Sequence, residues 1–267
     1  MKPWSEFNTI RFRQQLEDSK QCILLLDYDG TLAPFREAKE RNLAFPYPGV
    51  RDLLAKIMNQ GKTRVIIISA RPVTEIVHLV GLEPSPEVWG IYGWERRLSD
   101  GTYFAPPSLD LTLVRVLREA VEWAKQNEVE WEAKPDMENP VSVAFHWRVS
   151  TDPLGRSQSD LQEMITSYTG ECIKESNLLI KGGDHVQELM IPGQDKGDAV
   201  RAVLSELKSH GVVAYLGDSL GDEDAFEAIK PVGLGVLVSS QNRSTAAALH
   251  ISPPEELLEF LELWTNL

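Results

Sequence analysis

The sequence contains little cysteine. Cys22 and Cys172 are the only two cysteines among 267 residues, and they lie far apart along the chain. Two cysteines can build neither a framework of disulfides nor a zinc site with four sulfur ligands. A low cysteine content of this kind is typical of proteins kept in a reducing compartment, so we expect a cytoplasmic protein.

Long apolar runs and an excess of basic residues are also missing. No stretch approaches the ~20 apolar residues of a membrane span, and residues 1–6 lack the apolar core of a signal peptide. The chain carries 40 acidic residues against 27 basic ones, which gives a formal net charge of -13. Because nucleic-acid binding relies on basic surface, we expect no nucleic acid as partner. Because long apolar stretches are missing, we expect no membrane as partner either.

The chain has enough apolar residues, 42% of the total, for a large core. Strand and helix patterns alternate in residues 20–105 and again after residue 192, which predicts a parallel sheet covered by helices. Between them the order is helix, two strands, helix and two strands, with one strand near Cys172, which is typical of an α+β unit. We therefore expect a core made of residues 1–105 and 192–267, with residues 106–191 inserted into it.

Two carboxylates stand where an apolar strand ends. The run 22–26 reads as a strand buried on both faces, and Asp27-Tyr28-Asp29-Gly30-Thr31 follows it directly. Ligands of parallel sheets bind beyond the carboxyl ends of the strands. There, one carboxylate can attack phosphorus while the other handles protons and a divalent cation screens their repulsion. The alternative interpretation is an Asx turn that only caps the strand.

Three further segments place reactive side chains after apolar runs. Ser69 follows the run 65–68, Lys196 begins a helix with one apolar stripe, and the acidic loop 217–224 follows the run 212–216. Each has a purely structural alternative: a helix cap, an exposed cation in a first turn, and a solvated helix start. Their order along one chain favours a shared phosphate site.

In these four motifs the chain resembles the haloacid dehalogenase superfamily of phosphatases. Within it, the chain is similar to trehalose-6-phosphate phosphatases, which tend to show Asp-Tyr-Asp-Gly-Thr-Leu-x-Pro early and Gly-Asp-Asp-x-Thr-Asp-Glu-Asp late. The corresponding segments are residues 27–34 and 217–224, where Ser219 and Gly221 replace Asp and Thr. The resemblance implies an α/β fold with a Rossmann-like parallel-sheet core and an inserted α+β cap.

The motifs and the resemblance together assign roles to the core residues. Asp27 is expected to be the nucleophile, and Asp29 the general acid and then the base. Lys196 and Ser69 are expected to hold phosphoryl oxygens. Mg²⁺ is the expected cofactor, because it prefers hard oxygen ligands. Its expected ligands are the carboxylates of Asp27 and Asp218 and the backbone carbonyl of Asp29, with Asp222 orienting the set.

Further residues are expected to bind the substrate. In the core these are Thr31, through its hydroxyl and N–H, and Arg71. In the cap, the resemblance implies that Glu132, Lys134 and Glu188 contact the sugar. His146 and Arg148, on the predicted strand 141–148, are two further candidates. Polar side chains that merely alternate along a strand are the alternative explanation for the cap residues.

The expected function is hydrolysis of a sugar phosphate by a monomer, with trehalose 6-phosphate as first choice. Sucrose-, mannosylglycerate- or glucosylglycerate-type phosphates are alternative substrates. A regulator that binds a sugar phosphate without catalysis is a further alternative. A receiver-type signalling domain shares acidic strand ends, a hydroxyl and a lysine, but it needs only about half this length and no cap.

Overall fold

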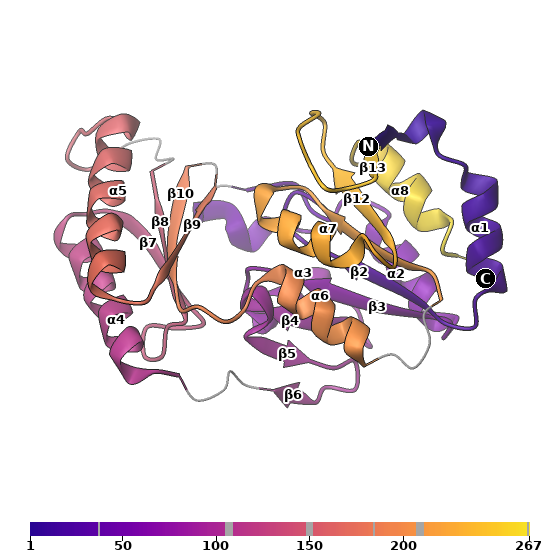
Figure 1. Ribbon diagram of the computed structural model, residues 1–267, viewed down its shortest axis with the longest axis horizontal. Coiled ribbons are helices and arrows are strands. Elements are labelled where there is room, and N and C mark those ends of the chain that lie inside the picture. The colour runs from indigo at the N-terminus through magenta and orange to yellow at the C-terminus, as the bar shows by residue number, and fades with distance from the viewer. Residues whose placement is uncertain (37, 105–108, 148–151, 184, 207–210, 266) are drawn as a thin grey trace. The chain divides into compact units, whose positions relative to one another are not determined.

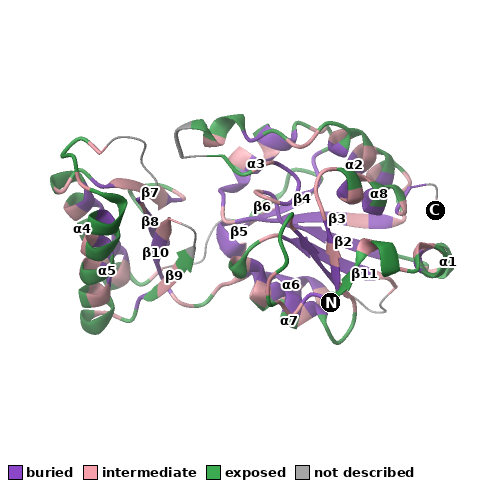
Figure 2. Cartoon of the chain, turned by 90° about the horizontal axis from the view of Figure 1, so that it is seen from above, coloured by how far each residue is buried: buried purple, intermediate pink, exposed green. Residues whose placement is uncertain are grey.

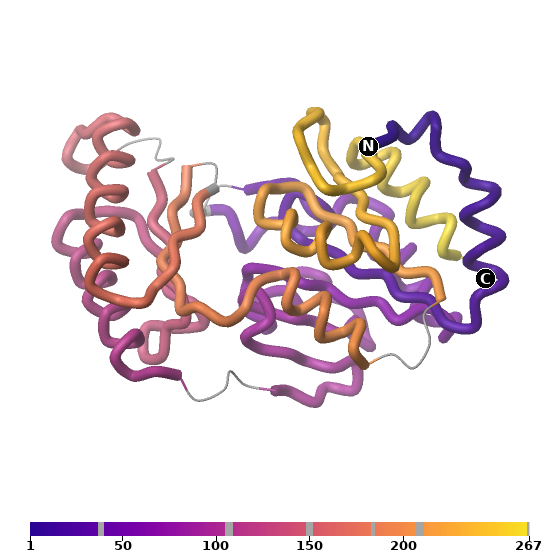
Figure 3. The backbone as a smooth tube through the Cα atoms, in the orientation of Figure 1, coloured from indigo at the N-terminus to yellow at the C-terminus, as the bar shows by residue number. Residues whose placement is uncertain are grey.

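The chain folds into two compact units, which the computed structural model describes for residues 1–36, 38–104, 109–147, 152–183, 185–206, 211–265 and 267. The core unit comprises Met1–Ala105 and Gln194–Leu267, and the inserted unit comprises Pro106–Gly193. Figure 3 follows the chain from the core unit into the inserted unit and back. The expected first junction, Ala105-Pro106-Pro107, lies outside the described residues. The expected return at residue 192 lies within two residues of Gln194.

One mixed sheet forms the centre of the core unit (Figure 1). Its described strands, in spatial order, are β1 (Lys2–Pro3), β13 (Leu249–Ile251), β12 (Leu234–Val238), β11 (Val213–Gly217), β2 (Cys22–Leu26), β3 (Thr63–Ile68), β4 (Glu87–Gly90), β5 (Glu95–Arg97) and β6 (Tyr103–Phe104). In this spatial order, all neighbouring strands between β1 at one edge and β4 pair in parallel. Strands β5 and β6 add an antiparallel hairpin at one edge. The short strands β1 and β13 were not predicted.

Helices cover both faces of this sheet, which explains why its central strands are apolar throughout (Figure 2). On one face lie α1 (Thr9–Asp18), α2 (Val50–Asn59), α3 (Val73–Val80) and α8 (Glu255–Glu262). On the other lie α6 (Lys196–Ser205) and α7 (Glu223–Ile229). Short 3₁₀ turns connect the elements: η1 (Trp4–Glu6), η2 (Ala38–Leu43), η3 (Ile91–Gly93) and η4 (Leu220–Asp222). Among the described residues, no helix combines the length and apolar character needed to cross a bilayer.

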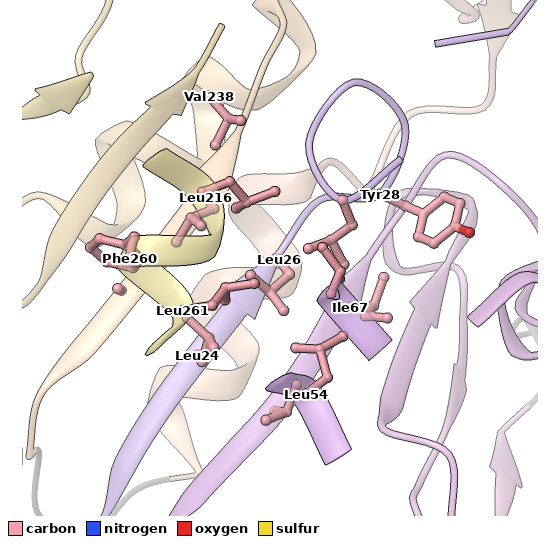
Figure 4. Close-up of a cluster of buried hydrophobic side chains, with 14 of the residues drawn as sticks. Leu24, Leu26, Tyr28, Leu54, Ile67, Leu216, Val238, Phe260 and Leu261 are labelled. Atoms are coloured by element: carbon pink, nitrogen blue, oxygen red, sulfur yellow. The ribbon is translucent and has the colours of Figure 1, made fainter. Parts of the chain in front are cut away.

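Strand β2 anchors the sheet through side chains that alternate between the two faces. Leu24 and Leu26 pack with residues of α2 and α8, including Leu54 and Phe260 (Figure 4). The intervening Leu25 packs in the second cluster, against α6 and α7. All five residues of β2 are buried. The end of this strand is therefore held by packing from both sides, which fixes the position of the residue that follows it.

The inserted unit has its own antiparallel sheet with two helices on one face. Its elements are α4 (Leu111–Gln126), β7 (Glu130–Lys134), β8 (Ser142–His146), α5 (Gln158–Glu175), β9 (Leu179–Gly183) and β10 (Val186–Met190), with strand order β7-β8-β10-β9. Phe145 of β8 packs edge-on against Trp123 of α4 and Tyr168 of α5. This contact identifies the face of the sheet that the helices cover.

The strand predicted near Cys172 is wrong, because that residue lies within α5. Helix α5 begins at a capping box, in which the Ser157 side chain accepts the Asp160 N–H and the Asp160 carboxylate accepts the Ser157 N–H. It continues through Gly170 to Glu175. A single glycine costs a helix only about 1 kcal/mol, so it did not end this one.

Glu87 organises an ion network at the start of β4. Its carboxylate is 5% exposed and accepts hydrogen bonds from Arg64 Nε (2.9 Å), Arg96 Nε (2.8 Å) and Trp89 Nε1 (2.7 Å). We expect Glu87→Ala to lower the free energy of unfolding by about 2–3 kcal/mol, because Arg64, Arg96 and Trp89 lose this acceptor. Urea denaturation followed by circular dichroism measures this change.

Glu227→Ala is the matched control for that experiment. Glu227 lies on α7 and pairs with Lys230 just after the end of that helix, and their side chains are 62% and 60% exposed. An exposed pair of this kind contributes less than about 1 kcal/mol. Equal destabilisation by the two variants would show that the Glu87 network contributes no more than a surface ion pair.

Candidate active site

The central strands of the core sheet bring three predicted residues to one edge. Leu26 of β2 pairs with Leu216 of β11 on one side and with Ile67 of β3 on the other. These three strands are parallel, so their carboxyl ends lie together. The residues just past these ends are Asp27 after β2, Asp218 after β11 and Ser69 after β3. The sheet register thus supports the predicted clustering of these side chains.

Asp27 is buried and contacts a lysine and a threonine. It is 3% exposed, and its Oδ1 accepts a hydrogen bond from Lys196 Nζ at 2.6 Å. Its Oδ2 accepts one from the Thr31 hydroxyl at 3.2 Å. The Thr31 N–H donates to the Tyr28 carbonyl. Both Thr31 donors that were predicted to bind substrate are thus engaged within the protein, and a substrate role for this residue stays a prediction.

Lys196 is held at the first turn of α6 by two carboxylates. Its Nζ contacts Asp222 Oδ1 at 2.7 Å in addition to Asp27. Asp195 caps this helix through a capping box with Asp198. Because the cap fixes where the helix begins, it also fixes where the ammonium group of Lys196 points. The structure therefore brings Lys196 into contact with Asp27, the predicted nucleophile, while the role expected of Lys196, holding a phosphoryl oxygen, stays a prediction.

Asp222 is fully buried, and both of its oxygens accept hydrogen bonds. Oδ1 accepts the Tyr215 hydroxyl at 2.6 Å as well as Lys196. Oδ2 accepts the N–H groups of Asp218 and Ser219 and the Ser219 hydroxyl. Although burial acts in the opposite direction, Lys196 and these donors hold the pKa of Asp222 below its usual value. Asp222 therefore fastens the loop that carries Asp218 and orients Lys196.

Tyr215 was not predicted as a site residue. It lies on β11, is fully buried, and is the polar member of an otherwise apolar run. A buried tyrosine hydroxyl needs a hydrogen-bond partner. A tyrosine in the apolar run just before the acidic loop was thus the available signal in the sequence.

Gly30 allows the Asp218 carboxylate to lie against the backbone of the first motif. Its φ of +80° lies in the left-handed region, and a Cβ built there would come 2.1 Å from Asp218 Oδ2. Any other residue at this position would force the Asp218 carboxylate away. The observed position of Asp218, in the last motif, therefore requires a glycine at position 30 in the first motif.

The three carboxylates of this cluster suit a divalent cation. Asp27, Asp218 and Asp222 each offer an oxygen, and these oxygens lie within 4.8 Å of one another. Burial raises the pKa of Asp27 to about 7, against the pull of Lys196. Burial and the charges of Asp27 and Asp222 raise the pKa of Asp218 well above its usual range. One ammonium cannot balance three carboxylates, so the donor set favours additional positive charge.

Asp29 lies at the same strand end, but its side chain pairs with Arg71. Arg71 Nε and Nη2 donate to the two carboxylate oxygens of Asp29 at 2.6 and 2.7 Å. The Ser69 hydroxyl accepts the Arg71 N–H at 3.1 Å and keeps its own proton for donation. The structure thus places Arg71 in contact with the predicted acid and base, and Ser69 in contact with the backbone of Arg71.

The predicted residues of the inserted unit share one face of its sheet. Glu132 pairs with Ala144, which pairs with Glu188, and Lys134 and His146 lie on the same face by register. This face is opposite to the one that Phe145 presents to the helices. Glu188 accepts hydrogen bonds from Lys134 Nζ (3.1 Å) and the Ser142 hydroxyl (2.5 Å). The predicted Arg148 lies outside the described residues.

Comparison with known proteins gives a consistent family. A trehalose-phosphatase family model matches residues 25–251. The trehalose-phosphate phosphatase of Mycobacterium tuberculosis is 27% identical over 255 residues, which cover 91% of this chain and 61% of that protein. A probable trehalose-phosphate phosphatase H of Arabidopsis thaliana is 28% identical over 92% of this chain and 72% of its own length. The chain thus spans about three fifths of the length of the mycobacterial relative.

Solved structures share the fold. The C-terminal domain of trehalose-6-phosphate phosphatase from C. albicans superposes with a TM-score of 0.77 at 20% identity, over 97% of this chain and 96% of that one. A trehalose-6-phosphate phosphatase of Aspergillus fumigatus gives 0.67 at 20% identity, over 97% and 98% of the two chains. These likenesses confirm the predicted fold class of a largely parallel α/β core with an inserted α+β unit.

Proposed function

Because the chain belongs to the trehalose-phosphatase family, we propose that it is a magnesium-dependent phosphatase that converts trehalose 6-phosphate to trehalose and phosphate. The observation that carries this proposal is the contact of Lys196 with both Asp27 and Asp222 beside the Asp218 loop. This arrangement supports the proposal, because it groups a buried carboxylate, a lysine and a candidate metal site at the carboxyl edge of one sheet. The relatives named above as trehalose-phosphate phosphatases support the choice of substrate.

The proposed reaction has two steps, which share Asp29. In the first, an Asp27 carboxylate oxygen forms a bond to phosphorus, the bond between phosphorus and the sugar oxygen breaks, and Asp29 gives that oxygen a proton. In the second, Asp29 takes a proton from water, whose oxygen attacks phosphorus and releases Asp27. Lys196 and Ser69 stabilise the phosphoryl oxygens while charge develops on them.

The candidate residues for holding magnesium are Asp27, Asp218 and the backbone carbonyl of Asp29, with Asp222 fastening the set. When bound, Mg²⁺ supplies positive charge that favours the ionised carboxylates and orients a phosphoryl oxygen. Asp222 is proposed to orient the other ligands and not to be a main ligand itself, because both of its oxygens already accept hydrogen bonds from the protein.

We further propose that the polar face of the inserted sheet binds the sugar. Glu132, Lys134 and Glu188 present carboxylate oxygens and ammonium N–H groups, which hydrogen-bond sugar hydroxyls well. A site built to satisfy such hydroxyls discriminates strongly, since a wrong sugar leaves buried polar groups unpaired. His146 lies at the end of the same face and adds a further hydrogen-bonding group.

The decisive experiment is phosphate release from a panel of sugar phosphates by the purified protein with Mg²⁺. The panel includes the 6-phosphates of trehalose, sucrose and glucose, together with mannosylglycerate and glucosylglycerate phosphates. We expect the highest kcat/KM for trehalose 6-phosphate. A higher value for another sugar phosphate would reassign the substrate, and no turnover of any of them or of 4-nitrophenyl phosphate would contradict a phosphatase.

Glu132→Gln separates sugar recognition from chemistry. The change removes a negative acceptor but keeps the shape of the side chain. We expect kcat/KM for trehalose 6-phosphate to fall about 10- to 100-fold, the scale of one unpaired buried polar group. Hydrolysis of 4-nitrophenyl phosphate, which has no sugar, should change by less than about twofold.

Glu119→Gln is the matched control for this prediction. Glu119 lies on α4 in the same unit and is exposed, with its side chain paired to Arg115. The same substitution there should leave both substrates unaffected. If Glu132→Gln slowed both substrates equally, the residue would support folding rather than recognition.

A further inference from the structure

Arg71 and Asp29 form a bidentate ion pair, with two parallel hydrogen bonds between the guanidinium and the carboxylate. Arg71 Nε donates to Asp29 Oδ2 at 2.6 Å, and Nη2 donates to Oδ1 at 2.7 Å. A pair of parallel hydrogen bonds fixes the plane of the carboxylate as well as its position. The Asp29 side chain is 27% exposed, whereas the Arg71 side chain is only 7% exposed. The arginine is thus the fixed partner and the aspartate the accessible one.

The remaining nitrogen of Arg71 is also engaged. Nη1 donates to the backbone carbonyl of Arg41 at 2.9 Å and lies 3.3 Å from Glu75 Oε2. Arg41 Nη2 contacts the same Glu75 oxygen at 2.9 Å. Each of the three guanidinium nitrogens therefore has a protein acceptor. Binding of a substrate phosphate through two nitrogens would require Arg71 to release at least one of these acceptors, Asp29 at Nε and Nη2 or Arg41 and Glu75 at Nη1.

We propose that Arg71 is a positioning residue that fixes the orientation of Asp29, and that it is not a ligand of the substrate phosphate. This inference rests on the proposed function, in which Asp29 exchanges protons with the sugar oxygen and then with water. An unrestrained aspartate samples several rotamers. The Arg71 guanidinium instead holds the Asp29 carboxylate in one orientation, so the lone pairs that do not bond Arg71 point in one direction. Misplacing a reacting group by about 1 Å can cost a factor of about 100 in rate.

The test compares Arg71→Met and Arg71→Lys on 4-nitrophenyl phosphate, with inorganic phosphate as inhibitor. We expect kcat to fall about 10- to 100-fold in both variants, because lysine cannot replace a two-pronged contact. The inhibition constant of phosphate should change by less than about twofold, since the phosphate contacts remain. A rise of that constant in step with the loss of kcat/KM would overturn the inference and make Arg71 a phosphate ligand.

A double-mutant cycle shows whether Arg71 acts through Asp29. In an Asp29→Ala background, Arg71→Met should change kcat by less than about twofold, because the group that it positions is gone. The same loss in both backgrounds would overturn the inference. Glu75→Gln loosens Arg71 without touching Asp29 and should lower kcat by about three- to tenfold. It keeps the test decisive if Arg71→Met fails to fold, and no loss in Glu75→Gln would then count against the inference.

Arg64→Met is the matched control. Arg64 also pairs with one carboxylate through two nitrogens, in this case Glu87. It lies in β3 near the opposite end of that strand from Ser69. We expect its loss to lower stability but to leave kcat within about twofold. A loss of kcat as large as that of Arg71→Met would show that the effect is only structural. Absence of turnover by the unaltered protein would instead overturn the proposed function and the inference together.

Discussion

Asp27→Asn is expected to lower kcat by about 10⁴-fold or more on every phosphate monoester. The amide keeps the size of the side chain but cannot attack phosphorus, so no aspartyl-phosphate forms. The fold should survive, because Lys196 keeps its contact with Asp222 at 2.7 Å. Burial raises the pKa of the natural Asp27 carboxyl to about 7, so a neutral amide removes an unfavourable buried charge. We therefore expect an unchanged or higher melting temperature.

Steady-state rates, thermal melts and mass spectrometry of rapidly quenched protein check this prediction. The unaltered protein should carry a phosphoryl adduct during turnover, and the variant should carry none. Asp52→Asn is the control, because Asp52 is exposed on α2 and lies outside the site. Turnover by Asp27→Asn near that of the unaltered protein would contradict covalent catalysis.

Metal removal is expected to have an effect of similar size. Excess chelator should abolish phosphate release, and added Mg²⁺ should restore it. Asp218→Ala should raise the Mg²⁺ concentration needed for half activity by at least about tenfold, since a carboxylate ligand is lost. Full activity in chelator would exclude a required metal. Asp100→Ala, in the hairpin turn between β5 and β6, should behave like the unaltered protein.

Thermal stability provides a second readout of metal binding. Without metal, burial and the charges of Asp27 and Asp222 raise the pKa of Asp218, so its removal relieves repulsion. Asp218→Ala should then melt at or above the temperature of the unaltered protein. With Mg²⁺ the order should reverse, because the unaltered protein binds the ion more tightly and gains more binding free energy. The same order in both conditions would show that Asp218 does not bind the ion.

The central strands and the residues that follow them were predictable because each carries its own local signal. The buried run of β2 needs helices on both faces, and the parallel order then places Asp27, Ser69 and Asp218 at one edge. The short strand β13, between β1 and β12, lacks such a signal, since three residues hold too little periodicity to be recognised. The strand predicted near Cys172 is wrong because helix α5 runs on past Gly170 to Glu175.

The partners of site residues were harder to predict than the residues themselves. Arg71 was expected to face the substrate, and only the structure shows its two-pronged contact with Asp29. Tyr215 contributes through a hydroxyl buried beneath the site. Such contacts join segments far apart in the sequence, and they depend on rotamers that no periodic pattern encodes. A motif therefore identifies chemical groups, while their orientation depends on tertiary packing.

The pairing of β2 with β11 also constrains the order in which the protein can mature on the ribosome. Ile23 pairs with Val213, so one side of the central strand stays without its neighbour until the segment that contains Val213 has been made. Lys196 also leaves the ribosome long after Asp27. Contacts between such distant segments form slowly, and an open strand edge favours aggregation in the meantime. The nascent protein thus carries Asp27 at an incomplete sheet edge until β11 has been made.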